Sequence, residues 1–225
     1  MGRVRLDLHV HSRHSPDSAL PVDAIAAHLA SVGLNGFALT DHNSVEGHAE
    51  LSTLRTRFPT FIFVPGVEVS TVEGHLLAYG VAEAPPAQRP VSETIEWVRQ
   101  HGGVAVLSHP FRLSHGVGRA IAESAPVSAI ETVNGHNSLR ANRKAAQVAQ
   151  RRGLGTTGGS DVHEFADLGR AYTEFPDGTS TLDAVLKSLR TGAMTAGGSS
   201  LSFLGRVQLE WRTTRLRLRR GFRPI

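Results

Sequence analysis

Histidines and carboxylates recur in this 225-residue chain in short groups whose spacing suits metal coordination. His9 and His11 are separated by one residue, and Asp161 and His163 repeat that spacing. Alternate side chains of an extended segment point the same way, so each pair could bind one ion together. Single residues of the same types complete a set of candidate metal ligands: Asp17, His42, Glu68, His75 and His109.

The residue types limit the chemistry of such a site. The chain has no cysteine, which excludes thiolate ligation, a cysteine nucleophile and a disulfide framework. Imidazole combined with carboxylate suits zinc, manganese or iron. These candidates exceed the roughly four to six ligands that one such ion binds. We therefore expect two to three divalent ions (Mn, Fe or Zn), with a carboxylate such as Glu68 shared between them.

Short apolar segments precede these groups along the chain. The hydrophobic pattern predicts strands at residues 4–8, 36–39, 61–64, 76–79, 104–107, 129–133, 155–157 and 171–175. Helices are predicted at 21–33, 45–58, 92–101 and 138–151, and from a capping box at 180–183 to 192. This alternation favours a mostly parallel sheet, open or closed into a barrel. The candidate ligands follow predicted strands, so we expect them to meet at one rim of the barrel.

The basic charge is concentrated at one end of the chain. Seven arginines and one glutamate lie between residues 206 and 223, a local net charge of +6, and the whole chain carries +4, which leaves −2 elsewhere. We expect residues 1–200 to form the barrel and residues 201–225 an arginine-rich tail, as a hairpin or a loose amphipathic segment. No segment approaches the roughly 20 apolar residues of a membrane span, and we expect a cytoplasmic protein.

Together these groups resemble the motifs of the PHP (polymerase and histidinol phosphatase) family. The resemblance rests on Asp7-x-His9-x-His11, Thr40-Asp41-His42, Gly66-Val67-Glu68, Gly74-His75, Ser108-His109-Pro110, Asp161-x-His163 and Leu168-Gly169-Arg170. It implies a single α/β domain, a distorted (β/α)7 TIM-like barrel with a trinuclear metal centre. The implied ligand sets are His9, His11, Glu68 and Asp161; Glu68, His75 and His109; and Asp17, His42 and His163.

The resemblance also implies a metal-dependent phosphoesterase, a hydrolase whose substrate is a small phosphomonoester, a nucleotide or a short oligonucleotide. Our hypothesis is in-line attack on phosphorus by a metal-bridging hydroxide. Glu68, His109 and Asp161 are the expected catalytic groups. Since this chain has only about fifty residues between His109 and Asp161, we expect the barrel loops themselves to bind the substrate.

Five further residues are candidates for roles around the ligands. Arg112 and Arg170 could bind phosphate oxygens, because a guanidinium matches them in bidentate geometry, or each could form an ordinary surface salt bridge. His14 lies in a predicted rim loop and could contact the substrate. Asp7 and Asp41 could orient ligating imidazoles, or they could accept hydrogen bonds from nearby backbone groups.

Two other functions fit parts of the pattern. Amidohydrolases also place His-x-His after the first strand of a barrel, but they often use a bridging lysine, and both lysines here, Lys144 and Lys187, fall in predicted helices. A non-catalytic module, stabilised by metal, could instead bind nucleic acid or another partner through the arginine-rich tail, because arginines attract phosphate backbones.

Overall fold

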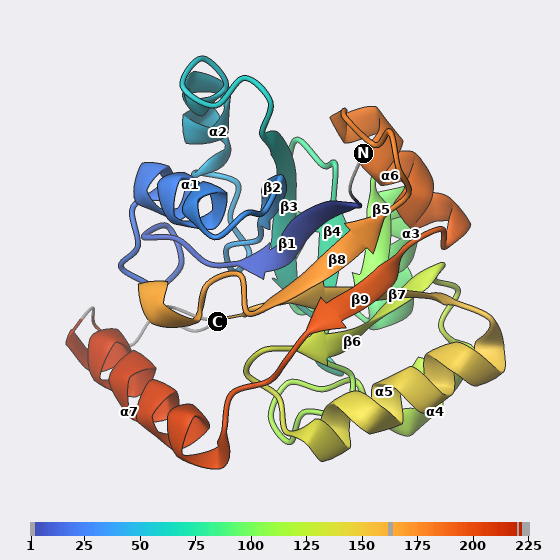
Figure 1. The fold of residues 1–225 in the computed structure, drawn as a ribbon. Coiled ribbons are helices and arrows are strands. Elements are labelled where there is room, and N and C mark those ends of the chain that lie inside the picture. Colours follow the sequence, from blue (N-terminus) through green and yellow to red (C-terminus); the bar gives the residue numbers. More distant parts are fainter. Residues whose placement is uncertain (1–2, 162–163, 220, 222–225) are drawn as a thin grey trace.

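The computed structural model describes residues 3–161, 164–219 and 221. Nine strands of this part of the chain form one sheet in the order β7-β6-β5-β4-β3-β2-β1-β8-β9 (Figure 1). The strands are β1 (Val4–Val10), β2 (Gly36–Leu39), β3 (Ile62–Ser70), β4 (His75–Tyr79), β5 (Val104–Leu107), β6 (Ala129–Asn134), β7 (Gly155–Gly159), β8 (Ala171–Phe175) and β9 (Thr195–Gly198). The helices are α1 (Val22–Ser31), α2 (His48–Leu54), α3 (Val91–Gln100), α4 (Gly118–Ser124), α5 (Leu139–Arg152), α6 (Leu182–Thr191) and α7 (Phe203–Arg219), with a short 3₁₀ turn, η1 (Phe165–Asp167).

The sheet curves into a nearly closed barrel. β4 and β8 run antiparallel to their neighbours, so the other seven strands share one direction. At the closure, the Gly158 amide donates to Thr173 Oγ1 (2.9 Å), and that hydroxyl donates to the Gly158 carbonyl (3.0 Å). The Ala196 amide donates to Thr156 Oγ1 (3.0 Å). The predicted single-domain α/β barrel is confirmed.

A glycine lets β7 approach β1 closely. A Cβ atom built on Gly159 would lie 2.2 Å from Cβ of His9, far inside contact distance. Two residues later, the Asp161 amide donates to the His9 carbonyl (2.8 Å). The missing side chain therefore brings the segment that carries Asp161 against the strand that carries His9.

Apolar helix faces cover the sheet and hold this geometry. On α1, Ile25 and Leu29 are one turn apart, are fully buried, and belong to one core cluster with Phe37 and Phe63 of the neighbouring strands. Burying each such side chain contributes about 2 kcal/mol. The pattern that predicted this helix therefore also positions the β1–β3 edge on which several candidate ligands lie.

Several element boundaries differ from the sequence expectation. The helix predicted at 45–58 is shorter in the structure, where α2 spans only His48–Leu54. The cap of α6 is Thr181, whose Oγ1 accepts from the Ala184 amide (3.2 Å), so the capping box expected at Ser180 is wrong by one residue. Strand β9 went unpredicted because its sequence, Thr-Ala-Gly-Gly, has no apolar alternation; α4 was also missed.

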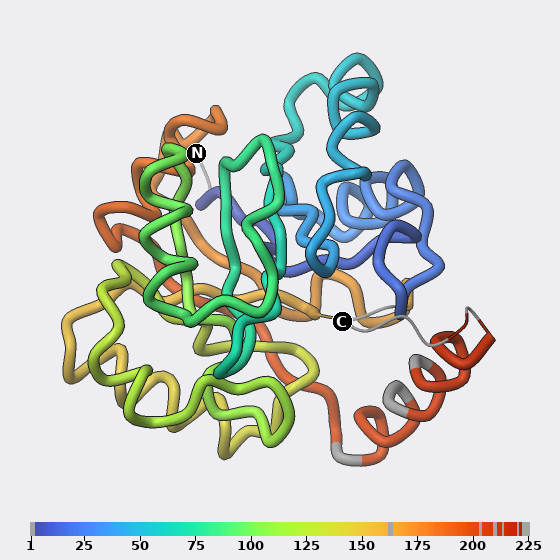
Figure 2. The backbone as a smooth tube through the Cα atoms, turned by 180° about the vertical axis from the view of Figure 1, so that it is seen from behind, coloured from blue at the N-terminus to red at the C-terminus, as the bar shows by residue number. Residues whose placement is uncertain are grey.

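The arginine-rich segment forms the helix α7, so the hairpin considered from the sequence is wrong. In both views α7 stands apart from the barrel, and in Figure 1 it lies on the side toward which β1 points (Figures 1 and 2). Among the described residues, none of the helices has the length and apolar character needed to cross a membrane.

Candidate metal centre

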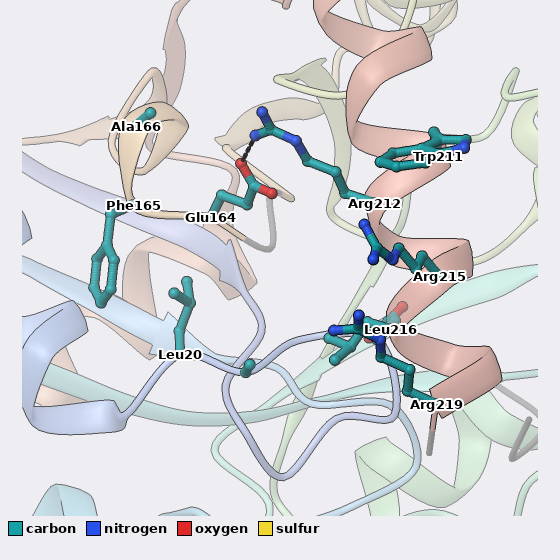
Figure 3. A pocket seen from close by; sticks show the side chains of 11 residues that line it. Leu20, Glu164, Phe165, Ala166, Trp211, Arg212, Arg215, Leu216 and Arg219 are labelled. Atoms are coloured by element: carbon teal, nitrogen blue, oxygen red, sulfur yellow. Dashed lines mark hydrogen bonds and ion pairs between the residues drawn. The ribbon is translucent and has the colours of Figure 1, made fainter. Parts of the chain in front are cut away.

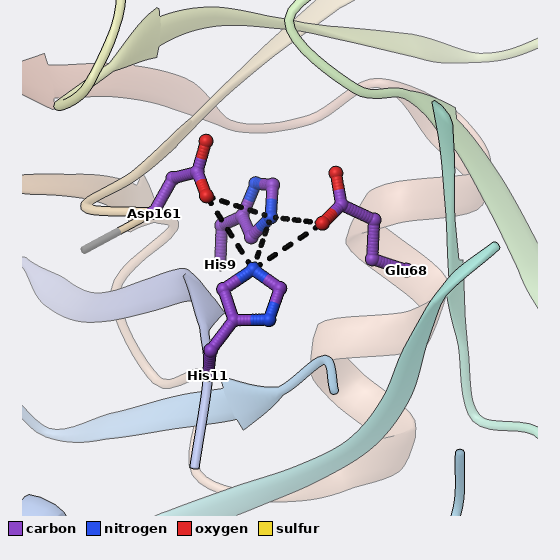
Figure 4. Close-up of side chains that lie close together, drawn as sticks. All are labelled: His9, His11, Glu68 and Asp161. Atoms are coloured by element: carbon purple, nitrogen blue, oxygen red, sulfur yellow. Dashed lines mark hydrogen bonds and ion pairs between the residues drawn. The ribbon is translucent and has the colours of Figure 1, made fainter. Parts of the chain in front are cut away.

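Four buried side chains converge at the rim of the barrel (Figure 4). Nε2 of His9 and Nε2 of His11 are 3.1 Å apart, and each lies 3.2 Å from Oε2 of Glu68. Oδ1 of Asp161 lies 3.5 Å from the His9 nitrogen and 3.4 Å from the His11 nitrogen. His9 lies on β1 and Glu68 on β3, whereas His11 and Asp161 directly follow β1 and β7.

This spacing fits one tetrahedral transition-metal ion. Donor atoms about 2.1 Å from a four-coordinate ion are roughly 3.4 Å apart, which follows from the geometry of a tetrahedron. The five distances among the His9, His11, Glu68 and Asp161 donor atoms lie between 3.1 and 3.5 Å. The buried cluster can therefore bind a metal ion with little rearrangement.

Glu68 presents its two oxygens to different groups. Oε2 faces His9 and His11, whereas Oε1 lies 2.9 Å from His75 Nδ1 and 2.9 Å from His109 Nε2 and accepts a hydrogen bond from Ser108 Oγ (3.0 Å). His75 reaches this rim because it begins β4, which runs antiparallel to β3. A carboxylate so placed can be shared between two cations.

His75 and His109 each turn one ring nitrogen toward Glu68 and leave the other unpaired. The unpaired nitrogens, Nε2 of His75 and Nδ1 of His109, are buried and make no hydrogen bond within the described part of the chain. Such unpaired buried groups are costly unless something binds them. A third group adjoins these: His42 Nε2 lies 3.3 Å from Asp17 Oδ2, and His42 Nδ1 lies 3.2 Å from Glu68 Oε2.

The local electrostatics keep the two central carboxylates ionised. Burial by itself would raise the pKa of Glu68, but His9 and neighbouring imidazoles hold this pKa well below its usual range. Burial would also raise the pKa of Asp161, which the Arg112 guanidinium and His9 hold well below its usual range. Burial disfavours protonated His11, yet hydrogen bonds to Asp161 and Glu68 raise its pKa to about 10. Binding a metal ion there must release protons.

Two candidate ligands follow their strands in a left-handed backbone conformation. The φ angles are 23° at His109 and 48° at Asp161. For a residue other than glycine this conformation costs about 1–2 kcal/mol. Hydrogen bonds hold both turns. The His109 amide donates to Glu131 Oε2 (2.9 Å), and Asp161 accepts hydrogen bonds from the side chains of Arg112 and Asn134. The strain turns the two side chains toward the cluster.

Asp7 and Asp41 both bind backbone groups. Asp7 accepts hydrogen bonds from the amides of His9 (3.2 Å), Ser160 (2.9 Å) and Gly169 (3.1 Å). Asp41 accepts hydrogen bonds from the amide of Ser12 (2.6 Å) and from its hydroxyl (2.7 Å). Of the two roles expected from the sequence, the structure gives these residues the one that fixes the backbone beside the ligands.

The candidate substrate contacts occupy different environments. Arg112 lies at the cluster, where it pairs with Asp161 and donates to Asn134 Oδ1 (2.9 Å) and Asn137 Oδ1 (3.0 Å). Arg170 is instead an exposed arginine paired with Asp167 (2.7 Å), which is the surface salt bridge considered as its alternative. His14 lies 2.6 Å from Glu50. His163 is outside the described residues.

Glu131, which the sequence interpretation missed, orients two candidate ligands. It is buried on β6, with Oε1 2.9 Å from Nδ1 of His9, and its Oε2 accepts from the His109 amide and from Asn134 Nδ2 (both 2.9 Å). A carboxylate on the rear nitrogen of an imidazole fixes the tautomer that presents the other nitrogen to a metal. An acid inside an otherwise apolar predicted strand was the available signal.

Comparisons with known proteins agree with this site. Family models match residues 7–84 (PHP domain) and 140–194 (PHP-associated). An uncharacterized protein from Methanocaldococcus jannaschii is 30% identical over 118 residues, which are 48% of this chain and 68% of that protein. This chain belongs to the PHP family.

Two solved structures share the fold. One is a two-domain protein from Bacteroides vulgatus that contains a predicted PHP-like metal-dependent phosphoesterase (TM-score 0.74, 18% identity, 88% of this chain and 65% of that chain). The other is a lesion-specific endonuclease from Pyrococcus furiosus (TM-score 0.63, 16% identity, 96% of this chain and 72% of that chain). This chain thus spans just under two thirds of the two-domain protein.

Proposed function

We propose that this protein is a metal-dependent phosphoesterase that hydrolyses a phosphate ester. The observation that carries the proposal is the buried cluster of four donor atoms from His9, His11, Glu68 and Asp161, whose spacing fits a metal ion. The second oxygen of Glu68, facing His75 and His109, supports a second ion beside the first. We propose manganese, iron or zinc, because the donors are imidazole and carboxylate.

The residues of the site have separate proposed roles around the ions, as metal ligands or as groups that orient a ligand. Bound divalent ions supply Lewis acidity and lower the pKa of water toward neutrality. His9, His11, Glu68 and Asp161 would hold one ion, and Glu68, His75 and His109 a second. Asp17, His42 and His163 remain the proposed third set. Glu131 fixes the orientation of the His9 imidazole from behind.

Arg112 is the proposed phosphate ligand of this site. Its guanidinium already lies against Asp161, and Asn134 and Asn137 hold it in place. An arginine fixed in this way offers further N–H donors to the oxygens of a phosphate beside the ions. We retain Arg170 and His14 as weaker candidates, since each is paired with a carboxylate of its own. Residues 1–200 would form the catalytic unit.

Elemental analysis and a phosphate-release screen test the proposal together. Purified protein should contain two to three divalent transition ions per chain, as the donor groups indicate. It should release phosphate from one class among sugar phosphates, histidinol phosphate, nucleotides and dinucleotides, and a chelator should stop the release. A metal-loaded protein that hydrolyses none of these esters would contradict the proposal and favour the binding module.

A further inference from the structure

Helix α7 lies beyond both matched family regions, the second of which ends at residue 194. It faces the barrel rim across a cleft of about 560 Å³. Asp17, of the third candidate ligand set, lines this cleft together with Leu20, Glu164 and Phe165. The opposite wall is α7 itself (Figure 3). Asp17 therefore belongs both to the cleft and to the candidate metal centre.

Three arginines of α7 line the cleft on one helix face. Arg212, Arg215 and Arg219 are spaced i, i+3 and i+7, which places them along one side of the helix over about 10 Å. Glu164, on the opposite wall, pairs with Arg212 (Figure 3). Among the described residues that line it, the cleft thus presents a row of guanidinium groups beside two acidic side chains, Glu164 and Asp17.

Exposed aromatic side chains lie in the same cleft. Trp211 is 63% exposed on α7, and Phe165 is 38% exposed on the facing wall. The Arg215 guanidinium lies 5.4 Å from the centre of the Trp211 ring. Basic grooves that also carry exposed aromatic rings typically bind single-stranded nucleic acid, because the cations contact phosphates while the rings stack on bases.

We propose that this cleft binds a single-stranded segment of nucleic acid, with Arg212, Arg215 and Arg219 on its phosphates and Trp211 and Phe165 against its bases. The assignment of the strand as substrate rests on the proposed function, since it places a phosphodiester or terminal phosphate next to Asp17. An anionic membrane is the competing ligand, but the arginine row of α7 faces the barrel and lines the cleft, so nucleic acid is favoured.

Trp211 provides the reporter for the test. The chain has two tryptophans, so the full-length Trp97→Phe protein emits from Trp211 alone. A hexameric oligothymidylate added with EDTA, which prevents turnover, should quench this emission in a saturable, salt-dependent way. In the Arg215→Gln/Arg219→Gln variant the affinity should fall roughly tenfold or more, and the slope of log K against log salt should lose about 1.4.

A matched variant controls for net charge. Arg55 and Arg89 are exposed and do not line the cleft, and Arg55→Gln/Arg89→Gln should bind like the parent. Equal binding by the Arg215/Arg219 variant and the parent would overturn the inference. So would the absence of quenching, or preferential binding to phosphatidylserine vesicles. If the EDTA assay shows binding but no ester is hydrolysed with metal present, the proposed function fails and the nucleic-acid site stands.

Discussion

The candidate metal centre and the α7 cleft adjoin each other but are built in opposite ways. At the centre, His9, Glu68 and Asp161 expose 2% or less of their surface, and several other groups hold each of them. In the cleft, Trp211 exposes 63% of its surface and the Arg212 side chain 56%. Catalysis needs donors fixed before the substrate arrives, whereas binding of a flexible polyanion does not.

The two regions also differ in how the chain supplies them. The centre draws side chains from β1, β3, β4 and the turns after β5 and β7, so no single element can move without disturbing it. One wall of the cleft is a single helix that follows β9 (Figure 1). If the proposed functions hold, the barrel would fix the catalytic groups, and the appended helix would supply the contacts to nucleic acid.

Removing a central ligand should have the largest effect. Asp161→Ala deletes one of the four tetrahedral donors and leaves Arg112 without its carboxylate partner. We expect kcat/KM for any hydrolysed ester to fall at least about a thousand-fold, or roughly 4 kcal/mol. Asp183→Ala, at an exposed position on α6, is the control. Retention of full activity in Asp161→Ala would show that the centre is not the active site.

Glycines in the two regions should respond differently to the same substitution. Gly159→Ala forces a Cβ against His9, and we expect it to lower the free energy of unfolding by about 3 kcal/mol. In α7, Gly205→Ala meets its nearest neighbours at 3.3 Å and gains helix propensity, so its effect should be below about 1 kcal/mol. Denaturant unfolding of both variants measures the contrast, and equal effects would contradict it.

Glu131→Gln tests the support behind the ligands. Glutamine has one side-chain oxygen, so it cannot accept from both His9 and the backbone amide of His109. We therefore expect the His9 imidazole to be held less firmly in its orientation. Loss of such a partner typically weakens metal binding about 10–100-fold, and we expect a change of that size in a metal titration. Glu123→Gln, on an exposed part of α4, should bind metal as the parent does. Unchanged affinity in Glu131→Gln would refute this orienting role.

Deleting α7 should have the smallest effect on the barrel. Truncation after Ser202 keeps Leu201, which is 6% exposed in the core, and removes a helix whose Leu204, Val207 and Leu218 are solvent-exposed. We expect Tm to change by no more than about 3 °C, because less than about 1 kcal/mol of packing is lost. Thermal unfolding checks this, and a drop beyond about 10 °C would mean that α7 belongs to the folded core.

The sequence predicted those elements whose residue spacing directly reflects their contacts in the fold. Ile25 and Leu29 of α1 repeat at helical spacing because they face the core, so the helix could be read directly. The candidate ligands could be grouped because strand ends share one rim. That Glu68 divides its two oxygens between separate groups depends on side-chain geometry, which spacing along the chain does not contain.

Glu131, β9 and α7 were not predicted because the spacing of their residues does not reflect their contacts in the fold. Glu131 is a single acid on β6, and its role depends on His9 and His109, which are 122 and 22 positions away in the chain. β9 is paired with β8 although its residues, including Gly197 and Gly198, carry almost no apolar signal. The sequence analysis left helix α7 open because its apolar side chains Leu204, Val207 and Leu218 are exposed and give no pattern of a core face. Arg170 is the opposite case. The sequence singled it out as a candidate phosphate ligand, but it forms a local ion pair with Asp167.

The pairing of Arg112 with Asp161 has a consequence for the maturation of the protein. A guanidinium of this chain already neutralises one carboxylate of the buried centre, so part of the charge that a metal would offset is balanced from within. We therefore expect the chain to fold before it binds metal, which circular dichroism of the metal-free protein would test.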